Sequence, residues 1–208
     1  MSSPNSVAGS GDPVQRHRLV DRIYHWVMAA CVLTLMATAF LPIIGWKFEW
    51  LAIHWVTGLV LTAAVVFHIL RSLFFQKIMN MVPDGKNISS LGMETKTGKY
   101  NLAQKLYHLA VAVLILSAIG SGLVMLRKID TPFWKRDAYW FSDHGWGIIY
   151  SLHDFAAMAL ITMVMIHVYF ALRPDEWHLT RSMFRGWMTR KEYQDHFDPK
   201  RWNTSDEA

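Results

Sequence analysis

The sequence is short of cysteine and of charge. It holds one cysteine, Cys31, and only 18% of its 208 residues are charged. A single thiol cannot form a disulfide within the chain. It also cannot supply the several cysteines that an iron–sulfur cluster or a cysteine-rich zinc site requires. Patterns that bind a pterin or a flavin are missing too. The composition therefore excludes enzymes that carry such a redox group on their own chain.

What the chain has instead is apolar sequence. Hydrophobic residues make up 52% of it, a composition typical of membrane proteins. The pI is about 9.4, but lysine and arginine fall between apolar runs rather than along one face, which argues against binding to nucleic acid. Residues 1–15 are rich in Ser, Gly, Pro and Asn, so we expect a flexible tail. They lack the features of a signal peptide, so we expect the first apolar run to be retained.

Four apolar runs are long enough to cross a membrane as helices, which takes about 20 residues. They cover residues 20–41, 51–75, 102–126 and 148–172. The sequence therefore predicts an all-α membrane protein in which four transmembrane helices form a bundle. We divide the chain into a tail (1–15), a transmembrane domain (16–173) and a C-terminal tail (174–208) that includes an amphipathic surface helix.

Positive charges near the ends of the spans predict the orientation of the chain. Lysine and arginine are frequent in the N-terminal flank, the second connection and the C-terminal tail, whereas the first connection offers only Lys47. The third connection is the exception, because it carries Arg127, Lys128, Lys135 and Arg136. This balance places both termini in the cytoplasm. The aromatic third connection suits an interfacial belt and equally a docking surface for an extracytoplasmic partner.

Histidine recurs at matched depths in the four spans. His153 and His167 lie fourteen residues apart in the fourth span. On an α-helix both therefore leave nearly the same face, about 21 Å apart along the axis. His54 and His68 repeat this interval in the second span. A lone histidine in an apolar helix usually hydrogen-bonds to a neighbouring helix. Six tiered histidines on four helices instead favour two haem irons, one toward each side of the membrane.

The sequence alone pairs these histidines only in part. At the outer level, His54 and His153 are the only candidates. At the cytoplasmic level, His167 can pair with His68, which preserves the fourteen-residue interval, or with His25 in the first span. An iron held by two imidazoles has no open position for oxygen or substrate. Such a site passes single electrons and carries out no bond chemistry.

Five segments of the chain resemble one family. They are RIYHW at 22–26, IHWVTG at 53–58, GKYNLAQK at 98–105, SLHDFAAMALITMVMIHVYFAL at 151–172 and SMFRGWMTRKEYQDHFDPKRW at 182–202. Together they resemble the cytochrome b (gamma) subunit of membrane-bound respiratory formate dehydrogenases. This family lies within the cytochrome b561 superfamily, which also includes the cytochromes b of nickel–iron hydrogenases. The resemblance covers nearly the whole chain after residue 15.

The resemblance implies two haem b groups, held within the four-helix bundle by four axial histidines. His25 and His167 match the ligands of the cytoplasmic haem, so the resemblance favours His25 over His68. His54 and His153 match the ligands of the outer haem. No residue of the chain is expected to be catalytic in the primary oxidation.

The resemblance also implies a quinone site beside the cytoplasmic haem. The matching residues at the start of the third span are Asn101, Ala103 and Gln104, although Asn101 also suits a helix N-cap. Amide N–H groups there suit a quinone oxygen that becomes negatively charged on reduction. His68 and His108 match no ligand of the family. We expect them to support the site by packing, by hydrogen bonding or by delivering protons.

The implied function is an electron-transfer anchor that crosses the bacterial inner membrane. Electrons from a molybdenum or tungsten subunit would pass through an iron–sulfur subunit to the outer haem and then to menaquinone or ubiquinone. Homo-oligomers of the whole complex are also compatible with this interpretation of the sequence. A short first connection and an insertion-like stretch at 173–179 depart from the family. They leave hydrogen or a sulfur oxyanion as alternatives to formate. The competing functions are a hydrogenase cytochrome b, a stand-alone cytochrome b561 that oxidises quinol or links superoxide to quinone, and a haem-free transporter or anchor.

Overall fold

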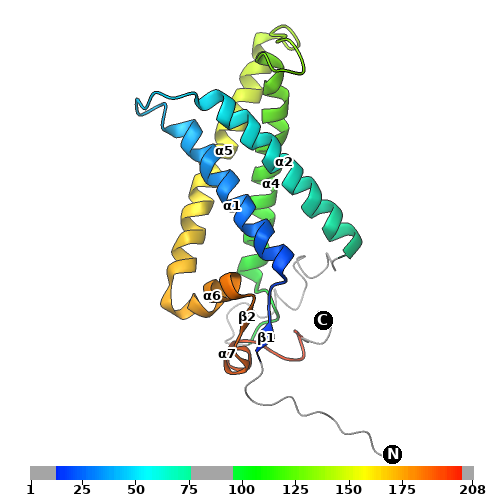
Figure 1. Ribbon diagram of the computed structural model, residues 1–208, viewed down its shortest axis with the longest axis vertical. Helices are drawn as coiled ribbons and strands as arrows, with labels where there is room; N and C mark the ends of the chain where they lie inside the picture. The colour runs from blue at the N-terminus through cyan, green and yellow to red at the C-terminus, as the bar shows by residue number, and fades with distance from the viewer. Residues whose placement is uncertain (1–12, 76–95, 203–208) are drawn as a thin grey trace, which may run out of the picture. The chain divides into compact units, whose positions relative to one another are not determined.

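Four long helices dominate the structure, a computed structural model that describes residues 13–75 and 96–202 (Figure 1). They are α1 (Leu19–Phe40), α2 (Trp50–Phe75), α4 (Leu102–Met125) and α5 (Asp143–Leu172). Each is long and apolar enough to cross a membrane, which confirms the four predicted spans. Residues 1–12 of the predicted tail and the middle of the second connection lie outside the described residues.

Local chemistry sets where these helices begin and end. α4 begins at a capping box, in which the Asn101 side-chain oxygen accepts from the Gln104 backbone N–H at 2.8 Å. The Gln104 side-chain oxygen accepts in return from the Asn101 backbone N–H at 3.0 Å. After α1, Pro42 is poorly suited to continue a helix, and Gly45 takes a φ of 94°, a conformation that favours glycine.

The helix α5 begins at Asp143, before the apolar run at residue 148 that predicted it. The Ser142 hydroxyl accepts a hydrogen bond from the Gly145 backbone N–H at 3.2 Å, as an N-cap residue does. In the same turn Trp146 is only 2% exposed, and its indole N–H donates to the Ala138 carbonyl at 2.8 Å. This first turn lies outside the apolar run, so hydrophobicity alone did not reveal it.

The chain divides into two compact units, of which the first is the helical unit, residues 24–75 and 106–167 of the described chain. Its buried core consists of Cys31 from α1, Leu61 and Val65 from α2, and Ile115 from α4, with the partly buried Leu160 from α5 packed against it. All four long helices therefore contribute to one apolar core.

The second is the terminal unit, which combines residues 13–23, 96–105 and 168–202 of the described chain. The strand β1 (Val14–Gln15) pairs antiparallel with β2 (Trp187–Met188), so that Val14 lies opposite Met188. Val14 and Gln15 thus form a strand, whereas the sequence placed them in a flexible tail. The short turn η2 (Leu126–Lys128), by contrast, follows α4 within the helical unit.

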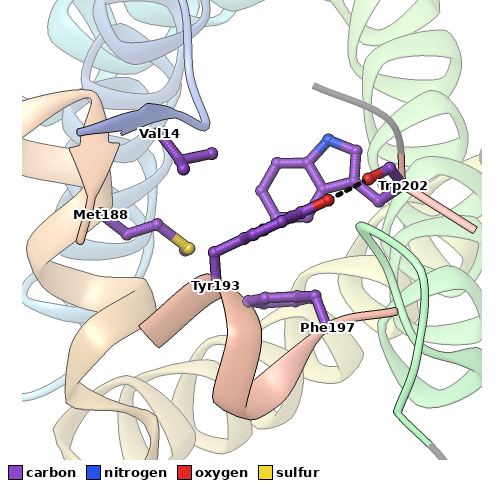
Figure 2. Close-up of a cluster of buried hydrophobic side chains, with 5 residues drawn as sticks. All are labelled: Val14, Met188, Tyr193, Phe197 and Trp202. Atoms are coloured by element: carbon purple, nitrogen blue, oxygen red, sulfur yellow. Dashed lines mark hydrogen bonds between the residues drawn. The ribbon is translucent and has the colours of Figure 1, made fainter. Parts of the chain in front are cut away.

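A small aromatic core holds the terminal unit together (Figure 2). Its buried members are Val14, Met188, Tyr193, Phe197 and Trp202. The Tyr193 hydroxyl donates to the Trp202 carbonyl, and the Phe197 and Trp202 rings meet edge to face with centroids 4.9 Å apart. Burial raises the pKa of the Tyr193 hydroxyl. The core therefore joins the first described residues to the last.

Three short helices complete the terminal unit: η3 (Pro174–Glu176), α6 (Trp177–Arg185) and α7 (Arg190–His196). A capping box between Thr189 and Glu192 begins α7, and Arg181 forms an ion pair with Glu192. α6 buries Ser182 and exposes Trp177 and Phe184. It is amphipathic as predicted, and its contact with the membrane surface stays a prediction.

Candidate functional site

Four histidines of the helical unit meet as two pairs. The ring centroids of His54 on α2 and His153 on α5 lie 6.2 Å apart, with 69° between the ring planes. Those of His25 on α1 and His167 on α5 lie 6.1 Å apart, with 57° between the planes. α5 therefore contributes one imidazole to each pair, about 21 Å apart along its axis.

The tautomer of His54 follows from the hydrogen bonds of Thr38. The Thr38 hydroxyl lies 2.8 Å from the carbonyl oxygen of Thr34 and 3.0 Å from that of Leu35, so its single proton is donated to its own helix. The same hydroxyl lies 2.8 Å from His54 Nδ1, so with its proton donated to its own helix it accepts from Nδ1–H. Nδ1 of His54 therefore carries the proton, and the lone pair lies on Nε2.

The tautomer of His153 is set in the same way from α4. Its Nδ1 lies 3.1 Å from the Ala118 carbonyl oxygen, which can only accept, so Nδ1 donates. The Ser121 hydroxyl, 3.0 Å away, is a second acceptor, because its own proton is donated to the Ser117 carbonyl at 2.6 Å. Both imidazoles of the His54–His153 pair thus keep the Nε2 lone pair, the form in which histidine binds a metal.

Aromatic rings surround the other pair. Tyr107 on α4 stacks on His167, with centroids 5.8 Å apart and 24° between the planes. The Tyr107 hydroxyl donates to the Met163 carbonyl at 2.9 Å, one turn before His167 on α5. Trp26 meets the edge of His25 at a centroid distance of 5.2 Å. Within the described part of the chain, ring contacts rather than hydrogen bonds therefore orient the imidazoles of the His25–His167 pair.

A third pair of imidazoles joins α2 to α4. The centroids of His68 and His108 lie 6.4 Å apart, and Tyr24 of α1 stacks on His68 at 4.5 Å. Spacing along the sequence offered His68 as an alternative partner for His167. The structure instead brings His68 to His108 and brings His25 to His167.

The three residues predicted to bind quinone lie in the terminal unit, at the start of α4. The capping box engages the side-chain oxygens of Asn101 and Gln104. This leaves their amide N–H groups as the donors that these side chains present to a ligand. Ala103, between them, is exposed. The helix-capping interpretation of Asn101 is thus correct, and it is compatible with a binding role.

Comparison with known proteins identifies the family. Residues 16–186 match the family described as Prokaryotic cytochrome b561. The chain belongs to this family. It is similar to the formate dehydrogenase cytochrome b556(fdo) subunit of Escherichia coli strain K12, with 27% identity over 194 residues that cover 86% of this chain and 87% of the relative.

Two further relatives carry similar names. The formate dehydrogenase cytochrome b556 subunit of Haemophilus influenzae is 27% identical over 192 residues, 84% of this chain and 76% of the relative. The nitrate-inducible formate dehydrogenase cytochrome b556(Fdn) subunit of Escherichia coli strain K12 is 23% identical over 181 residues, 76% of this chain and 77% of the relative. These comparisons confirm the resemblance that the sequence segments indicated.

Membership of the cytochrome b561 family implies haem b, and both histidine pairs fit it. Metal–imidazole bonds are about 2 Å long. In a five-membered ring with sides of about 1.33 Å, the nitrogen lies about 1.1 Å from the ring centre. Two imidazoles on opposite sides of one iron therefore have centroids about 6 Å apart, as the His54–His153 and His25–His167 pairs do. Rotation about the iron–nitrogen bonds changes the angle between the planes but not this distance.

Reasoning from the sequence missed the residues that orient these imidazoles. Thr38, Ser121 and Tyr107 are polar side chains within apolar spans, which is a weak signal because such residues also pack between helices. Their roles depend on how each helix is rotated toward its neighbour. The sequence gives no direct measure of that rotation.

Gly122 provides a test of the fit at His153. A Cβ atom added at Gly122 would lie 3.2 Å from His153 Cε1, whereas one added at Gly120 would meet no atom within 4 Å. We expect Gly122→Val to displace the His153 ring and to lower the haem b content per chain, measured by the pyridine haemochrome assay. Gly120→Val is the matched control and should keep the native content. Equal haem content in both variants would contradict the placement of this ring.

Proposed function

We propose that this cytochrome is the di-haem membrane subunit of a formate-dehydrogenase-like respiratory complex, in the bacterial inner membrane. The His54–His153 and His25–His167 pairs are the axial ligands of its two haem b groups. One observation carries the proposal: two imidazole pairs lie at the spacing of a shared iron and are linked by a single helix. Relatives named as cytochrome b556 subunits of formate dehydrogenases support it.

The residues of the chain determine what the bound haems do. Haem iron held between two imidazoles would supply one-electron exchange and would offer no site to oxygen or substrate. Between the two levels, the buried side chains of Cys31, Leu61, Val65 and Ile115 exclude water. The chain thus directs single electrons from one level to the other and protects them from side reactions.

The orientation follows from the distribution of lysine and arginine, which favours cytoplasmic termini. The His54–His153 pair then lies toward the outer face and receives electrons from an iron–sulfur subunit, itself supplied by a molybdenum or tungsten subunit. The third connection fits the docking of that subunit, because Phe133, Tyr139 and Trp140 are 75%, 96% and 55% exposed. Formate is the substrate that the names of the relatives favour for the complex.

At the cytoplasmic end of α4, the amide N–H groups of Asn101 and Gln104 suit a quinone carbonyl that gains negative charge as it is reduced. The exposed Ala103 lies between them and leaves room for a flat ring. His68 on α2 and His108 on α4, which meet within the helical unit, are the candidates for proton delivery. Menaquinone or ubiquinone would be the electron acceptor.

The haem assignment predicts different losses from different histidines. His54→Ala or His153→Ala should remove one haem and leave the other, because only one pair of ligands is broken. His25→Ala should remove the other haem. Haem content by pyridine haemochrome, together with the low-spin ferric signals in electron paramagnetic resonance, measures this. His68→Ala should retain both haems, as should His144→Ala, a control at the exposed start of α5. Loss of haem in His68→Ala but not in His25→Ala would overturn the inner pairing.

The quinone site has a test that leaves α4 intact. Asn101→Asp and Gln104→Glu keep the oxygens that cap the helix and remove the amide donors. We expect reoxidation of dithionite-reduced haem by a soluble quinone to slow by about 10- to 100-fold, because a hydrogen bond to a charged group contributes about 1.5–3 kcal/mol. Stopped-flow absorbance follows the reaction, and the haem spectra should not change. Native rates in both variants would place the quinone elsewhere.

The complex itself is tested by purification. The tagged chain, solubilised from its own membranes in a mild detergent, should co-purify with an iron–sulfur subunit and a molybdenum or tungsten subunit. The preparation should reduce its haems on addition of formate. A haem-containing chain that purifies alone would instead favour a stand-alone cytochrome b561. Reduction by hydrogen would indicate a hydrogenase cytochrome b.

A further inference from the structure

The two histidine pairs differ in what their ring nitrogens contact. In the His54–His153 pair, both Nδ1–H groups donate: His54 to the Thr38 hydroxyl, and His153 to the Ala118 carbonyl and the Ser121 hydroxyl. For His25 and His167, the structure of residues 13–75 and 96–202 shows ring contacts and no hydrogen bond to a ring nitrogen. The two pairs thus have similar distances between ring centroids, but in the described residues only the His54–His153 pair has hydrogen bonds to its ring nitrogens.

This difference bears on the iron that each pair would hold. An imidazole whose N–H donates to an acceptor carries more electron density and is a more basic ligand. A more basic axial ligand stabilises ferric over ferrous iron, so hydrogen bonds donated by the axial imidazoles of a haem lower its reduction potential. In the His54–His153 pair, both imidazoles donate such a hydrogen bond, so both ligands become more basic.

We propose that Thr38 and Ser121 are positioning residues that lower the reduction potential of the haem held by His54 and His153 below that of the haem held by His25 and His167. The inference rests on the proposed haem ligands. Haem iron held by His54 and His153 would serve as the one-electron donor, and haem iron held by His25 and His167 as the one-electron acceptor. The hydroxyl groups thus make transfer toward the quinone end energetically downhill.

The chain offers matched variants for a test. Thr38→Val and Ser121→Ala remove the hydroxyl groups that contact the histidines. Thr62→Val and Ser117→Ala are the controls, because these hydroxyl groups also donate to carbonyls of their own helices, Gly58 at 2.7 Å and Val113 at 2.8 Å, without contacting a histidine. Thr38→Ser retains a hydroxyl and should restore the native behaviour.

The measurement is a redox titration of the haem absorbance bands on the full chain purified with its bound subunits, with electron paramagnetic resonance of the ferric form. We expect Thr38→Val to shift the ferric–ferrous equilibrium of one haem toward ferrous iron by about two- to tenfold, the range for one neutral hydrogen bond. A tenfold shift corresponds to about 59 mV for one electron. Ser121→Ala should shift the same haem less, because the Ala118 carbonyl still accepts from His153. The haem that shifts should be the one that His153→Ala removes.

Failure of this inference differs from failure of the proposed function. If both haems are present and Thr38→Val changes neither potential, or changes it no more than Thr62→Val does, the role of the hydroxyl groups is refuted. A shift confined to the haem that His25→Ala removes refutes it as well. Absence of two low-spin haems in the native chain would instead refute the haem ligands themselves.

Discussion

A ring nitrogen of an imidazole within an apolar helix is costly to bury without a partner, and lipid offers none. The His54–His153 pair meets this constraint with a hydroxyl or carbonyl acceptor at Nδ1 of each ring, which leaves the Nε2 lone pairs for a metal. The acceptors come from Thr38 on α1 and from Ala118 and Ser121 on α4. Because the two imidazoles come from α2 and α5, all four long helices must keep their rotation and depth for this one ligand pair to form. The absence of a side chain at Gly122 is part of the same requirement, since a Cβ there would press on the His153 ring.

The helix α5 relates the two levels to each other. It supplies His153 and His167, so the separation of the levels is fixed by the rise of one continuous helix and not by packing between helices. The other ligands come from different helices, His54 from α2 and His25 from α1. Each pair can thus be tuned by its own surroundings, with hydrogen bonds at one level and stacked aromatic rings at the other. The proposed difference in potential is a consequence of this division.

Much of the fold could be predicted from the sequence, and part of the site could not. Length and hydrophobicity were enough for the four spans, because lipid constrains both. The depth of each histidine along its span was enough to propose His54 and His153 as one ligand pair. It could not decide between His25 and His68 as the partner of His167, because that choice depends on which faces of the helices meet. The terminal unit was missed for a related reason. The pairing of Val14 with Met188 joins residues at opposite ends of the chain, and neither segment has a hydrophobic period long enough to indicate a strand.

The strand pair β1–β2 has a consequence for biosynthesis. Val14 precedes the four long helices and Met188 follows them, so this contact can form only after all four helices have been synthesised. Until then Val14 has no partner in the aromatic core, and the β1 segment is open to proteases. A chain that stops early or fails to insert its last helix never completes the core of Tyr193, Phe197 and Trp202. Pairing of β1 with β2 thus marks a chain in which all four helices have been made, and protease resistance of these two strands would distinguish such a chain from a shorter fragment.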